Sequence, residues 1–236
     1  IFENIIKNVH NRHPLIHCIT NYVSINDCAN IVLACGGAPI MAEDINEVSQ
    51  ITSICQGLDI NIGMLNDNKL SSMLKAGATA NELGIPVILD PVGAGSSDYR
   101  IKAVQNLMSN VQFGVIRGNV SEIKAIAAKQ GIHNISAGVY DTMQKDKSAM
   151  GVEAGIADKI TDDNIKEMAD FINKLSQKTG AVIAVTGGID MVADENRVYA
   201  IRNGHKMMSL VTGAGCQLSA LTSAYVAADK EHILES

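Results

Sequence analysis

The sequence predicts an α/β fold of three layers, in which a mostly parallel central sheet is flanked by helices. Short β-branched runs alternate with helical patterns from end to end, and this alternation is typical of βαβ units. The expected strands cover residues 15–17, 38–41, 58–62, 87–90, 114–117 and 181–185. With 236 residues, 47% of them hydrophobic, the chain can bury a substantial core, so we expect one domain over residues 1–236.

Two helix starts are marked in the sequence. Asn119 is followed three residues later by Glu122, as in a capping box, which predicts a helix from that point. An apolar stripe with helical spacing predicts a second helix, and Thr161 and Asp162 are expected to cap its start. The stripe consists of Ile165, Met168, Ala169, Ile172 and Leu175.

Residues 190–204 interrupt the alternation. Two apolar runs, 191–193 and 198–201, flank Asp194-Glu195-Asn196, and this pattern predicts an antiparallel hairpin. Residues 131–157 show little periodicity, so we expect a loop with a short helix there.

Composition and charge exclude several classes of function. The 19 basic and 25 acidic residues give a net charge of −6, and basic residues do not form runs, so we expect no nucleic-acid or membrane partner. No apolar stretch reaches the length of about 18 residues that a membrane span needs. The first residues are too polar for a signal peptide, and we therefore expect a soluble, cytoplasmic protein.

Cysteine and histidine spacing indicates neither disulfides nor a metal site. The cysteines are Cys18, Cys28, Cys35, Cys55 and Cys216. Their number is odd and none forms a C-x-x-C pair, which indicates reduced thiols. His10, His13 and His17 lie close together, but Pro14 breaks any common helical face, so we expect solvated or capping roles for these histidines.

The most informative motif is Thr212-Gly213-Ala214-Gly215-Cys216, which directly precedes an apolar helical run. The first turn of a helix has N–H groups without partners, and a glycine approach lets a phosphate or a developing oxyanion come close to them. The helix dipole is expected to lower the pKa of Cys216. The structural alternative is a glycine turn that ends in a buried small hydrophobic residue. The motif is not a dinucleotide fingerprint, because Leu218 stands where the last glycine would be.

Three further strands end in residues that carry chemistry. In open parallel sheets ligands bind beyond the carboxyl ends of the strands, where Asp90, Arg117 and Thr186 are expected to lie. Asp90 and Glu122 form an acid pair that can hold Mg²⁺ together with substrate phosphates, and Arg117 can offset phosphate charge. The set favours phosphoryl transfer. Each residue also has a structural alternative: Glu122 as a helix cap, Asp90 as a turn cap, and Arg117 as a surface partner of Glu122.

Several segments, in order and at similar spacing, resemble hydroxyethylthiazole kinase, a branch of the ribokinase-like superfamily. They are residues 16–23, 38–42, 90–95, 117–122, 185–188 and 212–216, and the resemblance runs from about residue 14 to residue 228. It implies a ribokinase-like fold and phosphorylation of the hydroxyl of 4-methyl-5-(2-hydroxyethyl)thiazole, with ATP and Mg²⁺, in thiamine salvage. It also implies a homotrimer with active sites between subunits, and closing helices that follow Ser236 and are not included in this sequence.

The resemblance implies roles for the polar residues of the sheet edge. Arg117 and Thr186 match positions that contact ATP. Asp90 and Glu122 match positions around the metal and the phosphates. Gly188 departs from the pattern, since an acidic residue is expected there, and residues 133–159 depart from it as well.

The resemblance also implies a substrate pocket and a catalytic turn. Met41 and Gly213 match positions that contact the thiazole, and Asn21 and Val23 lie in the segment that lines that pocket. Cys216 stands where the superfamily usually has an aspartate that acts as the base. It is expected to act with the backbone of residues 213–215, either as a base for the alcohol or by orienting it.

Three other functions are considered beside this one. A binding protein that holds nucleotide or thiazole without turnover would need neither the acid pair nor the thiol. Cys216 could be a covalent nucleophile in acyl transfer, with His17 or His205 as its base. A kinase of hydroxymethylpyrimidine or another vitamin alcohol is disfavoured by cysteine in place of aspartate.

Overall fold

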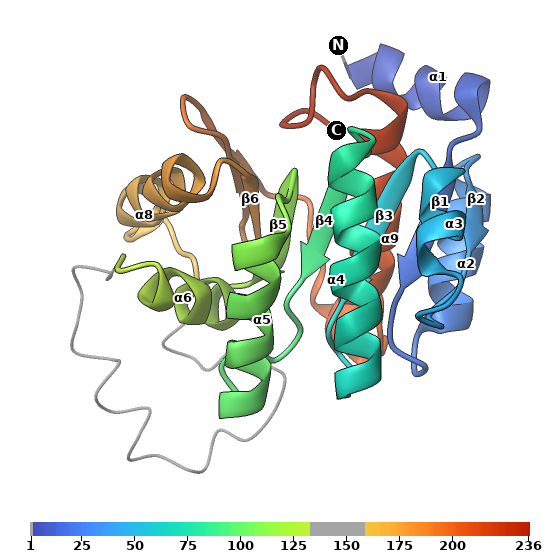
Figure 1. The fold of residues 1–236 in the computed structure, drawn as a ribbon. Helices are drawn as coiled ribbons and strands as arrows, with labels where there is room; N and C mark the ends of the chain where they lie inside the picture. Colours follow the sequence, from blue (N-terminus) through green and yellow to red (C-terminus); the bar gives the residue numbers. More distant parts are fainter. Residues whose placement is uncertain (1, 133–158) are drawn as a thin grey trace.

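The structure is a computed structural model that describes residues 2–132 and 159–236. Within these residues one sheet has the strand order β2-β1-β3-β4-β5-β6-β7-β8 (Figure 1). The strands are β1 (Leu15–Ile19), β2 (Ala38–Ile40), β3 (Gly57–Asn61), β4 (Val87–Asp90), β5 (Val115–Asn119), β6 (Val182–Thr186), β7 (Asp190–Ala193) and β8 (Val198–Ile201). Strands β1 to β6 are parallel, and β6, β7 and β8 pair antiparallel. The predicted fold class and the predicted hairpin are therefore confirmed.

Helices cover both faces of this sheet (Figure 1). They are α1 (Phe2–Arg12), α2 (Ile25–Ala34), α3 (Val48–Ser53), α4 (Asp67–Glu82), α5 (Asp98–Asn110), α6 (Val120–Lys129), α8 (Ile165–Thr179), the 3-10 helix η2 (Lys206–Leu210) and α9 (Ala214–Ala228). Their contacts place α3, α4, α5, α6 and α8 in one layer, and α1, α2 and α9 in the other. Among the helices of the described residues, none combines the length and apolarity that a membrane span requires.

Strand β3 shows how the sheet separates its two faces. Leu58 and Ile60 are fully buried in the larger core, on the side of α4. Because side chains alternate along a strand, Asp59 and Asn61 face the other layer, where α9 packs on β1, β3 and β4. The smaller core beneath α9 contains Cys18, Cys28 and Cys216 with the alanines of that helix. Polar and thiol groups therefore gather on the α9 side of the sheet.

One predicted helix start is confirmed and the other is wrong. At α6, the Oδ1 of Asn119 accepts a hydrogen bond from the Glu122 amide at 2.9 Å, and Glu122 returns the bond, which completes the capping box. Helix α8 begins after Asn164 and not after Thr161 or Asp162. The Oδ1 of Asn164 accepts from the Thr161 amide at 2.8 Å, so this side chain folds a turn ahead of the helix.

The prediction for His17 is also wrong. His10 and His13 are exposed, as expected, but His17 is fully buried in β1. Its Nδ1 lies 2.9 Å from Thr52 Oγ1 and its Nε2 lies 2.8 Å from the carbonyl oxygen of Ala42. Burial lowers the pKa of His17 and so favours the neutral ring, whose Nε2 can donate to the Ala42 carbonyl oxygen. The loop predicted over residues 131–157 falls almost wholly on residues 133–158, which lie outside the described residues.

Candidate functional site

The polar residues predicted at the sheet edge form a connected row across β4, β5 and β6. Arg117 Nη2 donates to Thr186 Oγ1 at 2.7 Å, and Arg117 Nη1 lies 3.8 Å from Asp90 Oδ2. The same Asp90 oxygen accepts hydrogen bonds from Asn61 Nδ2 at 2.7 Å and from Ser219 Oγ at 2.9 Å. Since β4, β5 and β6 are parallel neighbours, their carboxyl ends bring these side chains together, as the sequence predicts.

The charges in this row are buried but not fully paired. Asp90 is fully buried, and burial raises its pKa, while Arg117, Ser219 and Asn61 act in the opposite direction. Asp90 Oδ1 and Arg117 Nε have no hydrogen-bond partner. A buried donor and a buried acceptor without partners are costly to a fold.

Glu122 lies behind this row and holds two loops in place. Its Oε1 accepts from the Gly93 amide at 2.8 Å, and its Oε2 accepts from the Asn119 amide at 2.8 Å. Burial raises its pKa, and the negative charge of Asp90 adds to that shift. The structural alternative for Glu122 therefore holds, because this side chain is a helix cap. Its bond to Gly93 also fixes the loop that follows Asp90.

The glycine turn meets the row at the start of α9. Gly213 adopts φ +73°, a left-handed conformation that glycine adopts readily, and α9 begins with the next residue. At Gly215 a Cβ atom would lie 2.8 Å from Arg117 Nη1, so only glycine allows the helix to approach the guanidinium so closely. The first turn of α9 thus lies beside Arg117, and in this turn the Ala214 amide already donates to the Val211 carbonyl oxygen at 3.4 Å.

The substrate segment predicted around Asn21 reaches the same place from β1. Asn21 Nδ2 donates to Cys216 Sγ at 3.0 Å, and Asn21 Oδ1 accepts from Ser24. Met41 packs partly buried against the core that contains Cys216, and Val23 is 64% exposed. The structure therefore gathers an amide, a thiol, a glycine turn and an Arg–Asp pair at one end of the sheet.

Known proteins are similar to this chain in sequence and in fold. A family model for the hydroxyethylthiazole kinase family matches residues 6–236. A hydroxyethylthiazole kinase of Clostridium acetobutylicum is 52% identical over 231 residues, which cover 98% of this chain and 79% of the relative. The structure of a hydroxyethylthiazole kinase from Pyrococcus horikoshii superposes with a TM-score of 0.80 at 33% identity, and the match covers 96% of this chain and 76% of that one. The chain belongs to the hydroxyethylthiazole kinase family.

Membership of the hydroxyethylthiazole kinase family confirms the resemblance found in the sequence and makes the protein a kinase. A ribokinase-like superfamily protein from Enterococcus faecalis shares the fold alone, with a TM-score of 0.56 at 10% identity over 98% of this chain and 76% of that one. The ribokinase-like fold is therefore confirmed as well.

The predicted pKa shift of Cys216 is wrong in direction. Burial raises the pKa of this thiol, and the nearby Asp90 charge raises it further, against hydrogen bonds from Ser24, Asn61 and Asn21. Cys216 is 7% exposed, so the loss of solvation and the Asp90 carboxylate outweigh the dipole of α9. The raised pKa favours the neutral thiol of Cys216 at neutral pH.

Two structural alternatives from the sequence also fail on geometry. Arg117 is not a surface partner of Glu122, because it is buried and its neighbours are Asp90 and Thr186. Asp90 does not cap a turn, since the bonds that its carboxylate accepts come from side chains on β3 and α9.

The geometry also disfavours Cys216 as a nucleophile in acyl transfer. Both ring nitrogens of His17 are occupied by Thr52 and Ala42. His205 is exposed, and its Nδ1 accepts from the Met207 amide at 3.2 Å. Neither histidine makes a hydrogen bond to Cys216 in the part of the chain that the structure describes, so the base that such a nucleophile needs is not in place.

Sequence reasoning missed two residues of this site. Asn61 Nδ2 donates to Asp90 Oδ2, and Asn61 Oδ1 lies 3.3 Å from Asn21 Nδ2, so Asn61 joins the Asp90–Arg117 pair to the Asn21 segment. Ser219 contacts Asp90 from α9. The signals were present: Asn61 ends a buried apolar strand, and Ser219 follows Cys216 by three residues, which places the two on one face of a helix.

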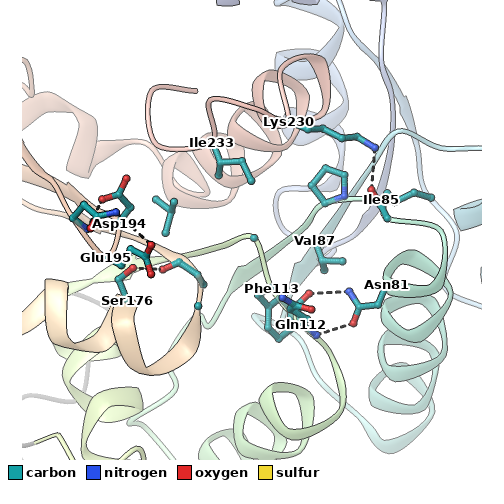
Figure 2. A pocket seen from close by; sticks show the side chains of 17 residues that line it. Asn81, Ile85, Val87, Gln112, Phe113, Ser176, Asp194, Glu195, Lys230 and Ile233 are labelled. Carbon is teal, nitrogen blue, oxygen red and sulfur yellow. Dashed lines mark hydrogen bonds between the residues drawn. The ribbon is translucent and has the colours of Figure 1, made fainter.

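A separate pocket lies at the end of the sheet away from these residues, and Figure 2 shows the side chains that line it. It has a volume of about 600 Å³ and is lined by residues near the amino ends of β4, β5 and β6. Its polar groups bond to one another: Asn81 exchanges two hydrogen bonds with Gln112, and Lys230 donates to the Gly84 carbonyl. It contains none of the site residues predicted from the sequence.

The conformation of Gly213 leads to a stability prediction. We expect Gly213→Ala to lower the free energy of unfolding by about 1–2 kcal/mol, because an L-residue is strained in the left-handed region. The new Cβ would also lie 2.6 Å from Ser24 Cβ. Urea unfolding followed by circular dichroism measures the loss. Gly188→Ala is the matched control, since a Cβ there meets nothing within 4 Å, and equal losses in the two variants would refute the argument.

Proposed function

We propose that this protein transfers the γ-phosphoryl group of ATP to the hydroxyl of 4-methyl-5-(2-hydroxyethyl)thiazole, as a thiamine-salvage kinase formed by residues 1–236 as one domain. The observation that carries the proposal is the meeting of the Asn21–Cys216 bond with the Asp90–Arg117 pair at the head of α9. The Asn21–Cys216 pair can make hydrogen bonds to an alcohol, and the Asp90–Arg117 pair can bind phosphates and their metal ion. Phosphoryl transfer needs such positioning and charge stabilisation more than covalent chemistry.

The phosphate side of the reaction is assigned to the sheet edge. Arg117 and Thr186 contact the ATP phosphates. The hydrogen bond from Arg117 Nη2 to Thr186 fixes the orientation of the guanidinium group. The amide groups of residues 213–216 hold the transferring phosphoryl at the start of α9, where the helix dipole favours negative charge. Because Gly215 has no side chain, the start of α9 comes close to the Arg117 guanidinium. The amide groups and the guanidinium can therefore donate to the same phosphate.

The substrate side is assigned to loops from β1 and β2. Met41, Asn21, Val23 and Gly213 line the thiazole pocket, and the thiol of Cys216 orients the hydroxyl toward the phosphoryl group. Proton removal comes late in a loose transition state, so a neutral thiol suffices for this role.

Asp90 and Glu122 are the residues that would hold Mg²⁺. Asp90 Oδ1 has no partner and is available, whereas each Glu122 oxygen already accepts one amide bond and can contact the ion through water. Within the described residues there is no cluster of three or more metal-binding side chains, which suits an ion that takes the rest of its ligands from phosphates and water. When bound, the ion would neutralise phosphate charge.

We also propose that the active protein is a homotrimer whose thiazole pockets lie between subunits. Strongly exposed apolar side chains near the glycine turn support this arrangement, since such patches mark contact surfaces. They are Val23, Met207, Met208, Leu210 and Val211. In the trimer, Met41 and Gly213 of one pocket would come from different copies of the chain.

The direct test is thiazole-dependent formation of ADP. Purified protein is mixed with Mg·ATP and the thiazole alcohol, with a no-thiazole reaction as control and hydroxymethylpyrimidine as a competitor. We expect ADP only when the alcohol is present. ATP binding without turnover would reject the kinase proposal in favour of a binding role.

The role of Cys216 gives a sharper prediction. We expect Cys216→Ala to lower kcat about fivefold to tenfold, because it removes one hydrogen bond to the alcohol. A general base would cost about 10²–10⁴ in rate. Steady-state ADP release measures the effect, and Cys216→Ser, which keeps a donor at this position, is the matched control. A loss above about 10² in the alanine variant would show that the thiol removes the proton.

A further inference from the structure

A buried lysine lies between the two loops of the proposed alcohol pocket. Lys69 is in the first turn of α4, where the side chain of Asn66 caps the helix, and it is 3% exposed. Lysine side chains are rarely buried without partners, because desolvating the ammonium is costly. The groups around its Nζ therefore show what holds it there.

Three groups from two loops surround the Lys69 ammonium. Nζ donates to the carbonyl oxygen of Thr20 at 2.5 Å and lies 3.0 Å from Glu43 Oε2. It also stands 4.6 Å from the centre of the Tyr22 ring, within the range of a cation–π contact. Tyr22 in turn donates its hydroxyl hydrogen to Glu43. Lys69, Tyr22 and Glu43 thus form a closed triangle.

This triangle joins the segments on which the proposed pocket depends. Thr20 and Tyr22 flank Asn21, which bonds to Cys216, and Glu43 stands two residues after Met41. The loop after β1 and the loop after β2 have no helix or strand of their own at these positions. The contacts of Lys69 therefore fix the position of Asn21 and Met41 relative to each other.

The charge of Lys69 is matched within the triangle. Burial raises the pKa of Glu43, but the hydrogen bonds from Tyr22 and Lys69 and the charge of Lys69 outweigh it, so the pKa of Glu43 is lowered and its carboxylate stays ionised. An apolar side chain at position 69 would leave this carboxylate without its cation and Thr20 without its donor.

Resting on the proposed function, we propose that Lys69 is a positioning residue for the alcohol substrate, which acts through Thr20, Tyr22 and Glu43 and touches neither ATP nor the reacting atoms. Its contribution is to hold the Asn21 loop beside Cys216 and the Met41 loop in place. In the proposed trimer these two loops of one chain serve neighbouring pockets, so each pocket depends on the Lys69 of both copies that form it. The nucleotide residues Arg117 and Thr186 lie on β5 and β6, apart from these loops in the strand order. The two substrates should therefore respond differently to its loss.

The test is the full steady-state kinetics of Lys69→Met. We expect KM for the thiazole alcohol to rise about tenfold, as for the loss of one hydrogen bond between the displaced loops and the alcohol, while KM for ATP stays within about twofold. Lys69→Arg keeps the charge and should recover part of the loss. Glu43→Gln keeps an acceptor for Tyr22 and should raise KM for the alcohol less than Lys69→Met does.

Lys75→Met is the matched control. Lys75 is on the same helix and donates to the Ile45 carbonyl oxygen at 2.8 Å. It therefore contacts the loop after β2 but is not one of the three residues of the triangle. We expect it to leave both KM values within about twofold. Equal changes in both KM values, or no change, in Lys69→Met would overturn the proposal. If Lys69→Met does not fold, Glu43→Gln decides: a rise in KM for the alcohol with KM for ATP within about twofold supports the proposal, and equal changes in both KM values, or no change, overturn it. Wild-type turnover in the same assay separates these outcomes from failure of the kinase proposal.

Discussion

Replacing Asp90 with asparagine is expected to lower kcat by about 10²–10³, the range typical for loss of one group that stabilises transition-state charge. Asparagine keeps the size of the side chain and an oxygen that accepts from Asn61 and Ser219, so the row at the sheet edge is retained. The carboxylate charge beside Arg117 and the unpartnered Oδ1 are lost. If Asp90 also helps to hold Mg²⁺, the Mg²⁺ concentration needed for half-maximal rate rises as well.

Ser219→Ala is the control for this prediction. It removes one of the hydrogen bonds to Asp90 and leaves the charge, so we expect a loss of less than about tenfold. Thermal unfolding of each variant tests whether the fold persists. If Asp90→Asn turns over within about tenfold of wild type at the same Mg²⁺ requirement, Asp90 does not stabilise the transferring phosphoryl group or its metal ion.

The parts of the site that follow from local pattern were predictable from the sequence. β-branched runs place β1 to β6, and the parallel arrangement they imply brings Asp90, Arg117 and Thr186 to one edge without knowledge of any contact. The capping box at Asn119 is equally local, because both of its partners lie within one helical turn.

The parts that depend on distant neighbours were not predictable. The position of Cys216 at a helix start indicates a lowered pKa, but burial and Asp90 raise it, and these come from packing of α9 on β3 and β4. Asn61 and Lys69 carry no motif, and their roles appear only when loops from separate strands meet. The burial of His17 is of the same kind, since its partners lie on segments that follow it by some distance in the chain.

The largest effect on stability is expected at Asp59. This residue is fully buried in β3, and neither of its carboxylate oxygens has a hydrogen-bond partner. Leaving such a polar group unpaired costs about 1–3 kcal/mol in protein mutational data. We therefore expect Asp59→Val to raise the free energy of unfolding by about 1–3 kcal/mol at pH 4, where the buried carboxyl group is protonated, and by more at pH 8. Asp59→Asn keeps an unpartnered polar side chain and should gain less.

The stability gained by Asp59→Val should increase as the pH rises. Burial raises the pKa of Asp59 well above its ordinary range and Asp90 adds to the shift, against Arg117; Cys18 and Cys28 also lie in its surroundings. In the unfolded chain Asp59 loses its proton near pH 4, whereas the folded chain retains it to much higher pH. The folded state then binds more protons, so the stability of the wild-type protein falls as pH rises from about 4 toward the raised pKa.

Urea unfolding of wild type and Asp59→Val between pH 4 and pH 8 measures this difference. Glu122 also has a raised pKa and contributes a similar slope in both proteins. Asp90 is coupled to Asp59, so the difference between the two curves reports Asp59 together with its coupling to Asp90. We expect the curves to be closest at pH 4 and to separate as pH rises. A constant difference across the range would mean that Asp59 keeps its ordinary pKa in the fold. A less stable valine variant at pH 8 would mean that the carboxyl group contributes to the folded structure, because its burial would then be offset by a stabilising interaction.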